Sequence, residues 1–345
     1  MRDLTRRRLL TAAAASGAAV LAGCAGGDDE ATASGETTAQ ASFFVFGEVA
    51  AHVAGDAAAA DLLVPVGQHG HGWEPGPRVR GEIYAADLFV HGMPGFQPWV
   101  DDVLSDLAAD DADVMAVDAG RTVDLLPAGG HEGEHDEVHT DHDGTETSHD
   151  GTETAHNGTE SHDEHDHEGA DPHFWMDPTR TADAVDAVEA AFAEVDPANE
   201  EAYAENATVF REELAALDDR IAEVVAAGSV DTLLVAGHDS FQYLAARYDI
   251  HVEALTGVSP DDRPTPRDIE RAQEIIAEHD LRYVCADPLE SQQAAEQLVA
   301  ETDAEAVLPL TAMPGRTEAW AEKGWGYVEV MESVTLPTLE RALET

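Results

Sequence analysis

The chain has 345 residues, of which 43% are hydrophobic, enough for two domains of ordinary size with buried cores. Its 71 Asp and Glu residues against 18 Lys and Arg give a formal net charge of −53. This balance argues against nucleic acid as a partner, because neutralising phosphates requires basic groups. It favours a halophilic protein that stays dissolved in concentrated salt, with the attraction of metal cations to a site as the alternative.

The first 24 residues are interpreted as an export signal. Paired arginines in TRRRLL (5–10) precede an Ala/Gly-rich apolar run that is too short for a transmembrane helix, which favours twin-arginine export. The run ends in Leu-Ala-Gly-Cys, which resembles a lipobox and makes Cys24 the expected lipidation site. Residues 25–41 offer nothing to bury and are interpreted as a flexible tether. The sequence therefore predicts an exported protein, anchored by a lipid to the outer face of the cytoplasmic membrane.

Short apolar runs alternate with helical stretches along the rest of the chain. The expected strands cover residues 42–46, 61–66, 87–91, 113–117, 232–236, 282–286 and 306–310. The expected helices include residues 99–109, 266–279 and 291–302. Strand–helix alternation predicts parallel sheets covered on both faces, so the sequence predicts two α/β lobes, over 42–198 and 229–345.

A long helix is expected between the lobes, over residues 199–228. Its larger apolar residues, from Tyr203 to Val224, recur in steps of 7, 4, 3, 4 and 3, which places them on one helix face. Such a helix would extend roughly 40 Å and could join two lobes. Two shorter helices with a kink are the alternative, since no strong break signal decides between them.

Residues 129–169 differ in kind from the rest of the chain. They combine many histidines and acidic residues with almost no apolar ones, and they contain the repeat DGTETSH (143–149), DGTETAH (150–156). Because such a segment cannot form a core, it is interpreted as a disordered surface loop. Its imidazoles are expected to bind zinc, copper or nickel weakly, with a solvated insert without function as the alternative. The nine histidines of this His-rich tract are His131, His135, His139, His142, His149, His156, His162, His165 and His167.

Three other histidines, His71, His173 and His238, lie at the ends of expected strands or in the loops that follow them. Ligands bind at the carboxyl ends of strands in open α/β sheets, and three imidazoles would make a typical zinc site. Their separations of 102 and 65 residues carry no local metal-site signature. On the residues alone, a shared metal site competes with three unrelated histidines.

The segments around these histidines resemble the metal-contacting motifs of the zinc- and manganese-binding lipoproteins of ABC transporters, the ZnuA/TroA-type solute-binding family. HGWEP (71–75), DPHFWMDP (171–178) and HDSFQY (238–243) match its three motifs, and the second motif is highly specific. The resemblance covers nearly the whole chain from Ser42. It implies two Rossmann-like lobes joined by one long backbone helix, with His71, His173 and His238 holding a metal in the cleft between the lobes.

The fourth ligand is where the sequence departs from this family, which usually supplies a carboxylate from a late loop of the second lobe. Thr311 or a near neighbour stands in that stretch here. The alternatives are water, Glu74, His69 or a histidine of the His-rich tract. Asp177 and Asp239 are candidates for orienting ligand imidazoles, with helix capping as the alternative for each.

Three histidines without an acidic fourth partner favour Zn²⁺ over Mn²⁺, because imidazole suits zinc and hard oxygen donors suit manganese. The resemblance implies a monomeric, high-affinity binding protein that delivers Zn²⁺ to the permease of an ABC transporter. Binding needs neutral imidazoles, so affinity is expected to fall below about pH 6.5. The rival functions are a manganese-binding protein of the same type, an exported zinc hydrolase with Glu74 as general base, and a metal-storage or adhesive surface protein.

Overall fold

The structure, a computed structural model, describes residues 36–128 and 169–344. The expected export signal with Cys24, most of the expected tether and all nine histidines of the His-rich tract lie outside these residues, so what the sequence predicts for them stays a prediction. Within the described residues, every helix is either too short or too polar to cross a bilayer.

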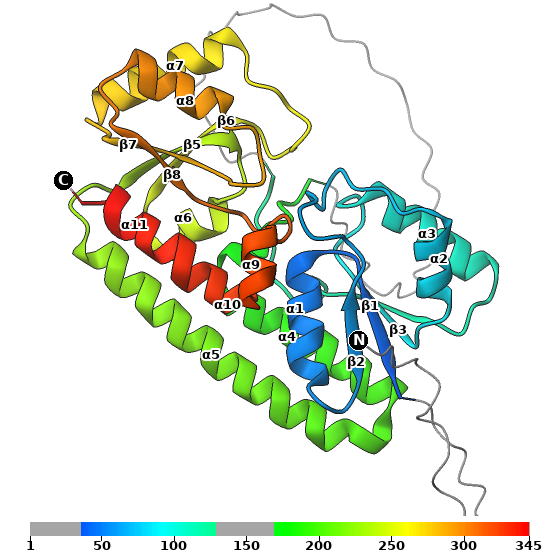
Figure 1. The fold of residues 1–345 in the computed structure, drawn as a ribbon. Helices are drawn as coiled ribbons and strands as arrows, with labels where there is room; N and C mark the ends of the chain where they lie inside the picture. The colour runs from blue at the N-terminus through cyan, green and yellow to red at the C-terminus, as the bar shows by residue number, and fades with distance from the viewer. Residues whose placement is uncertain (1–35, 129–168, 345) are drawn as a thin grey trace, which may run out of the picture. The chain divides into compact units, whose positions relative to one another are not determined.

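The first lobe is built on four parallel strands in the order β2-β1-β3-β4 (Figure 1). Its strands are β1 (Thr38–Ala41), β2 (Ala59–Leu62), β3 (Leu88–His91) and β4 (Met115–Asp118). Its helices are α1 (Phe44–Ala54), α2 (Pro77–Tyr84), α3 (Pro98–Ala109), the 3-10 turn η1 (Phe174–Met176) and α4 (Pro178–Val195).

Strand β3 shows how both faces of this sheet become covered. Leu88 and Val90 belong to the core shared with α1 and α4, whereas Phe89 belongs to a separate core shared with α2 and α3. Successive side chains of a strand point to opposite faces, and all four residues of β3 are buried. Such double burial is typical of parallel sheets. Figure 1 shows α1 on one side of the sheet and α2 with α3 on the other.

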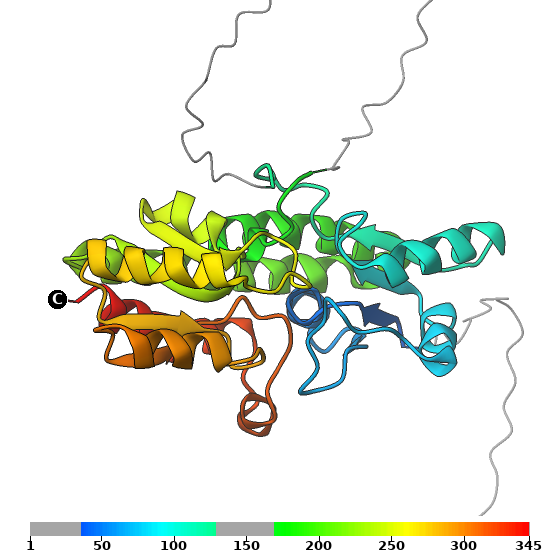
Figure 2. The same cartoon turned by 90° about the horizontal axis from the view of Figure 1, so that it is seen from above.

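The second lobe repeats this pattern with four parallel strands in the order β6-β5-β7-β8. Its strands are β5 (Thr232–His238), β6 (His251–Thr256), β7 (Tyr283–Ala286) and β8 (Ala306–Pro309). Its helices are α6 (Gln242–Tyr248), α7 (Pro266–Glu278), α8 (Gln293–Glu301), α9 (Glu318–Lys323), α10 (Tyr327–Val330), the π-helical segment η3 (Met331–Thr335) and α11 (Leu336–Ala342). Both cartoon views show α7 and α8 as neighbours (Figures 1 and 2).

The predicted linking helix is α5 (Glu200–Ala227), a single helix of 28 residues that follows the 3-10 turn η2 (Pro197–Asn199). Its buried face includes Phe210, Leu214 and Leu217, as the apolar spacing predicts. It packs against α1 and α4 of the first lobe and against α6, α10 and α11 of the second, and Figure 1 shows it running along both. The fold prediction of two α/β lobes joined by one long helix is therefore confirmed.

The strand expected over residues 42–46 is wrong. The first strand is β1, which lies within the expected tether, and helix α1 begins at Phe44. Phe44, Val45 and Phe46 are all buried, because α1 is enclosed between the first sheet and α4 and α5. A short run of consecutive apolar residues has no period, so it cannot distinguish a buried helix from a buried strand.

Candidate metal centre

His71, His173 and His238 come together in space. One nitrogen from each lies within 4.8 Å of the others, and within the described residues this is the one such group of His, Cys, Asp or Glu side chains. The ring centroids are 5.4 Å apart for His71 and His173 and 5.3 Å apart for His173 and His238. Donors on a tetrahedral zinc ion are about 3.4 Å apart, for Zn–N bonds of about 2.1 Å. Small rotations of the three rings therefore suffice to place them on one ion.

His173 precedes the turn η1 and is fully buried. Its ring nitrogen Nδ1 lies 2.7 Å from Oδ1 of Asp171, and its backbone N–H donates to the same oxygen at 2.9 Å. Asp171 is held in turn, since its carbonyl accepts from the Tyr243 hydroxyl at 2.6 Å. An ionised carboxylate only accepts, which puts the proton on Nδ1. The other nitrogen, Nε2, is left buried without a hydrogen-bond partner and is available to a metal.

His238 is the last residue of β5, where a register shift after Val235 interrupts the pairing with β6. Its Nδ1 lies 3.0 Å from Oε1 of Glu290, which belongs to the loop after β7, the neighbour of β5 in the sheet. Its Nε2 is buried without a partner, as in His173. Two of the three imidazoles are thus oriented by carboxylates, the arrangement that fixes the tautomer and raises the basicity of a ligating nitrogen.

His71 lies in the loop between β2 and α2 and is positioned by aromatic rings and by backbone contacts. Its ring makes edge contacts with Phe43 and Phe96, at centroid distances of 5.3 and 4.6 Å. The preceding residue, Gly70, donates its N–H to the carbonyl of Pro314 in the second lobe at 2.7 Å. A Cβ at Gly70 would lie only 2.6 Å from the Phe43 ring. Only glycine allows the loop to lie this close and so to hold His71 at the centre.

Burial favours the neutral form of the His71 and His173 imidazoles. It lowers the pKa of His71 well below 6.5, and the neighbouring imidazoles lower this pKa further. Burial also lowers the pKa of His173, although the contact with Asp171 opposes this shift. Neutral imidazole is the form that binds a metal, so the folded protein holds these two side chains ready for binding at neutral pH.

Asp177 and Thr311 have other roles in the structure. The Asp177 carboxylate caps α4 by accepting the N–H of Thr179 at 2.8 Å and pairs with Arg180 at 3.4 Å. The Thr311 hydroxyl donates to the buried carboxylate of Asp287 at 2.6 Å. Burial raises the pKa of Asp287 to about 6. Capping is therefore the alternative that the structure supports for Asp177, and Thr311 uses its hydroxyl away from the three histidines.

The remaining candidates also lie outside the group of three histidines. Glu74 is exposed. Asp239 is buried and accepts hydrogen bonds from Gln242 at 2.8 and 3.0 Å. His69 is the nearest of them, with its Nε2 3.4 Å from Oε1 of Glu290.

Asp171 and Glu290 were not singled out by the sequence as partners of the histidines. For Asp171 a signal exists, because it stands two residues before His173, close enough for a local turn in which its carboxylate accepts from that residue. For Glu290 there is none, because it lies 52 residues after His238 in a loop whose course only the fold determines.

Aromatic side chains enclose the centre. Trp175 is fully buried, lies 5.4 Å from His173 between ring centroids and donates its Nε1–H to the carbonyl of Ala312 at 2.8 Å. Phe174 and Phe241 are buried as well. Trp73, in contrast, packs edge-on against Trp99 in the core of α2 and α3. Trp175 thus packs beside His173, while cavities reach His238 and His71.

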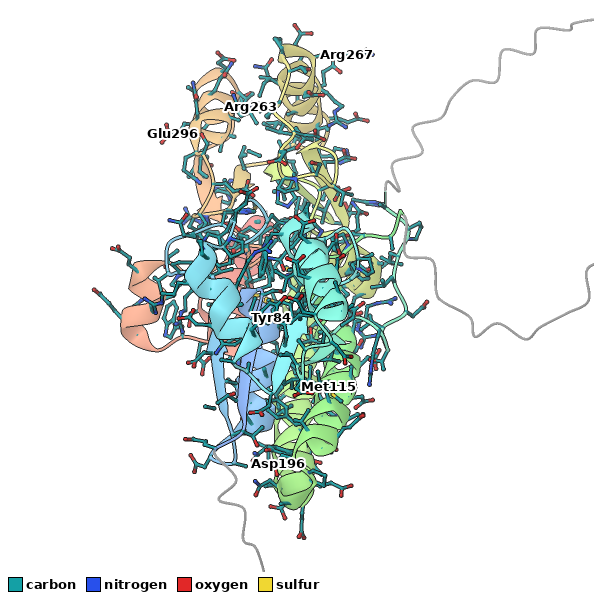
Figure 3. All side chains as sticks on the ribbon, turned by 90° about the vertical axis from the view of Figure 1, so that its right-hand side faces the viewer. Tyr84, Met115, Asp196, Arg263, Arg267 and Glu296 are labelled. Carbon is teal, nitrogen blue, oxygen red and sulfur yellow. The ribbon has the colours of Figure 1, made fainter. Side chains whose placement is uncertain are left out.

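A cavity of about 830 Å³ opens beside the centre. The residues that line it include His69, His238 and Glu290, and also Asp262 and Arg263. Figure 3 shows Arg263, one of the lining residues, between α7 and α8. The cavity gives solvent a route to the side of the centre where His238 and Glu290 meet.

Comparison with protein families identifies the fold and the lineage. The model of the ZnuA family, described as the periplasmic component A of a zinc-uptake complex, matches residues 40–342. The chain belongs to the ZnuA family. The zinc-binding lipoprotein AdcA of Streptococcus pneumoniae is 28% identical over 300 residues, which are 87% of this chain and 54% of AdcA. The high-affinity zinc uptake system protein ZnuA of Bacillus subtilis is 27% identical over 291 residues, 84% of this chain and 83% of that protein. This member of the ZnuA family therefore spans about half the length of its AdcA relatives.

Solved structures show the same fold for this ZnuA-family chain. The Zn(II)-bound ZnuA-like domain of Streptococcus pneumoniae AdcA superposes with a TM-score of 0.69 at 24% identity, covering 90% of this chain and 100% of that domain. The metal-dependent lipoprotein YcdH of Bacillus subtilis gives a TM-score of 0.68 at 23% identity, covering 90% of this chain and 100% of YcdH.

Proposed function

We propose that this chain is the zinc-binding component of an ABC-type uptake system, which captures Zn²⁺ outside the membrane and delivers it to a permease. One observation carries the proposal: the Nε2 atoms of His173 and His238 are buried, unpartnered and close to a nitrogen of His71. A buried nitrogen without a hydrogen-bond partner destabilises the folded protein unless a ligand binds to it. Membership of a family described by zinc uptake supports zinc as that ligand.

The donor set favours zinc over manganese. Three imidazole nitrogens lie close together. The nearby carboxylates of Asp171 and Glu290 contact the Nδ1 atoms of His173 and His238 and are not part of this group of nitrogens. Manganese prefers oxygen donors, and zinc is well served by nitrogen. Three protein ligands leave one tetrahedral position, which we assign to water from the adjoining cavity.

The same geometry favours a zinc-binding protein over a zinc hydrolase. A zinc hydrolase needs a general base beside the metal-bound water. Glu74, the candidate base, is exposed and outside the group of three histidines.

The membrane attachment belongs to the proposal as well. Relatives named as lipoproteins support a lipid on Cys24, which would hold a monomeric protein at the outer face of the cytoplasmic membrane after twin-arginine export. The His-rich tract would then collect zinc near the folded site, as an accessory to it.

Isothermal titration with Zn²⁺ tests the proposal. We expect one tight site per chain together with weaker sites from the His-rich tract, and deletion of residues 129–168 should remove the weaker sites alone. If tight one-to-one binding disappears with the tract, the three folded histidines are not the zinc site.

Replacing Asp171 with asparagine should weaken zinc binding by about 10–100-fold, as is typical when the partner of a metal-ligating histidine is lost. The amide can no longer fix the proton on Nδ1 of His173 as a carboxylate does. Asp177→Asn is the matched control, because Asp177 caps α4 and asparagine caps equally well. Competition with a zinc-binding dye measures both affinities. Equal losses in the two variants would contradict the orienting role of Asp171.

A further inference from the structure

His69 and Glu290 form a contact at the inner end of the 830 Å³ cavity. Their side chains are each 23% exposed, and His69 Nε2 lies 3.4 Å from Glu290 Oε1. Behind them His238 is 5% exposed and His173 is fully buried. His238 lines the same cavity. Because His69 and Glu290 are more exposed than His238 and His173, an ion in the cavity can contact them first.

The pair adjoins the three histidines closely enough to pass an ion to them. The ring of His69 lies 5.3 Å from that of His71 and 6.3 Å from that of His238, between centroids. The first distance equals that between the rings of His173 and His238. Glu290 Oε1 also lies 3.0 Å from His238 Nδ1, so one carboxylate oxygen faces both an outer and an inner imidazole.

His69 does not serve His71 as Asp171 serves His173. Both residues stand two positions before a histidine of the centre, in His69-Gly70-His71 and in Asp171-Pro172-His173. The carboxylate of Asp171 accepts from His173, whereas the imidazole of His69 turns its Nε2 toward Glu290. A zinc-binding side chain thus occupies this position and faces the cavity.

We infer that His69 and Glu290 form a transient zinc site, through which the ion passes between the cavity and the three histidines of the centre. This inference rests on the proposed function. An imidazole nitrogen and a carboxylate oxygen are both ordinary zinc ligands. The arriving ion replaces the His69–Glu290 contact, keeps water in its other positions and then exchanges that water for His238 and His71. Stepwise exchange avoids the large cost of moving a bare dication into a buried site.

The kinetics of such a site differ from those of a permanent ligand. A transient site on the path lowers the barrier in both directions, so its loss slows association and dissociation by the same factor and leaves Kd unchanged. A permanent ligand contributes to the bound state, so its loss raises Kd, mainly through faster dissociation.

The experiment follows Co²⁺ binding to the full chain by stopped-flow absorbance, because a tetrahedral nitrogen-rich site gives cobalt a strong visible spectrum. We expect His69→Ala to slow association and dissociation alike, by about tenfold, which corresponds to about 1.4 kcal/mol of barrier. His69→Gln keeps a hydrogen-bond donor for Glu290 but lacks the imidazole, so it should slow both rates to the same extent. His251→Ala is the matched control, since it removes an exposed imidazole that lies outside both the cavity and the group of three histidines, and it should leave both rates unchanged.

Each other outcome overturns the inference. A higher Kd with unchanged association makes His69 a permanent ligand, and unchanged rates in His69→Ala remove it from the path. Normal rates in His69→Gln reduce its role to holding Glu290. If the unmodified chain gives no saturable tetrahedral spectrum, the three-histidine site itself is wrong, which separates failure of the proposed function from failure of the transient site.

Discussion

Replacing His238 with alanine is expected to abolish tight zinc binding. Two imidazoles and water then remain, and the affinity should fall by more than the about 10–100-fold that accompanies loss of a ligand's hydrogen-bonding partner. The variant also leaves Glu290 without its closest imidazole. Titration calorimetry measures the loss directly. Thermal unfolding measures it independently, because a ligand that binds only the folded state adds about 2.7 kcal/mol at 100 times its Kd. Zinc should therefore raise the melting temperature of the unmodified chain and leave that of His238→Ala almost unchanged.

Two further variants test whether the loss of zinc in His238→Ala is specific to a ligand of the centre. His71→Ala should lose zinc in the same way, although His71 comes from the first lobe. His251→Ala should keep full affinity, because its side chain is exposed and outside the centre. A melting temperature of apo His238→Ala close to that of the apo unmodified chain shows that the fold is intact. Tight one-to-one binding retained by both His71→Ala and His238→Ala would refute the site.

The three histidines could be predicted as one group because the segments around them resemble the motifs of the ZnuA family, and the topology is consistent with that grouping. The loops that follow the strands of an open parallel sheet meet at one edge, so histidines far apart in the chain can meet there. His238 ends a strand that the sequence predicts well, and the distinctive motif around His173 marks it independently. The long helix α5 was also predictable, since its apolar period continues from Tyr203 to Val224, although the period did not exclude a kink between two shorter helices.

The rest depends on contacts that no local pattern encodes. Glu290 reaches His238 because β7 pairs with β5. The loop of His71 packs closely against Gly315 of the second lobe. A Cβ added at Gly315 would lie 2.2 Å from the carbonyl oxygen of Gln68. Strand β1 was missed for another reason: its four residues, Thr-Ala-Gln-Ala, carry almost no apolar signal, and its pairing on both sides makes it a strand. In all three cases, contacts between residues that are far apart in the sequence determine the structure.

Zinc binding by the folded centre should persist to lower pH than binding by ordinary histidines. The sequence alone predicts a fall from about pH 6.5, the usual pKa of imidazole. Burial lowers the pKa of His71 well below that value and lowers that of His173. Protons therefore compete with zinc for these two nitrogens only at lower pH. Once His71 and His173 are protonated in the apo protein, these two residues should lower the affinity by up to about 100-fold per pH unit, one factor of ten for each proton displaced.

A peptide of residues 129–168 provides the comparison within the same chain. Its histidines lack the buried surroundings of the folded centre, so its zinc should be lost at higher pH than the zinc of the full chain, in titrations between pH 7.5 and 5. Coincident pH profiles would contradict the lowered pKa values.

The free energy of unfolding of the apo protein should also decrease as the pH falls, as far as these histidines contribute to it. A histidine whose pKa is lower in the folded state takes up its proton first in the unfolded state, so its contribution is complete above pH 6.5 and is lost as the pH falls. Asp287, with its raised pKa of about 6, acts in the opposite direction, so the histidine contribution is measured as the difference in unfolding free energy between the unmodified chain and His71→Ala. That difference should shrink as the pH falls from 7.5 to 5.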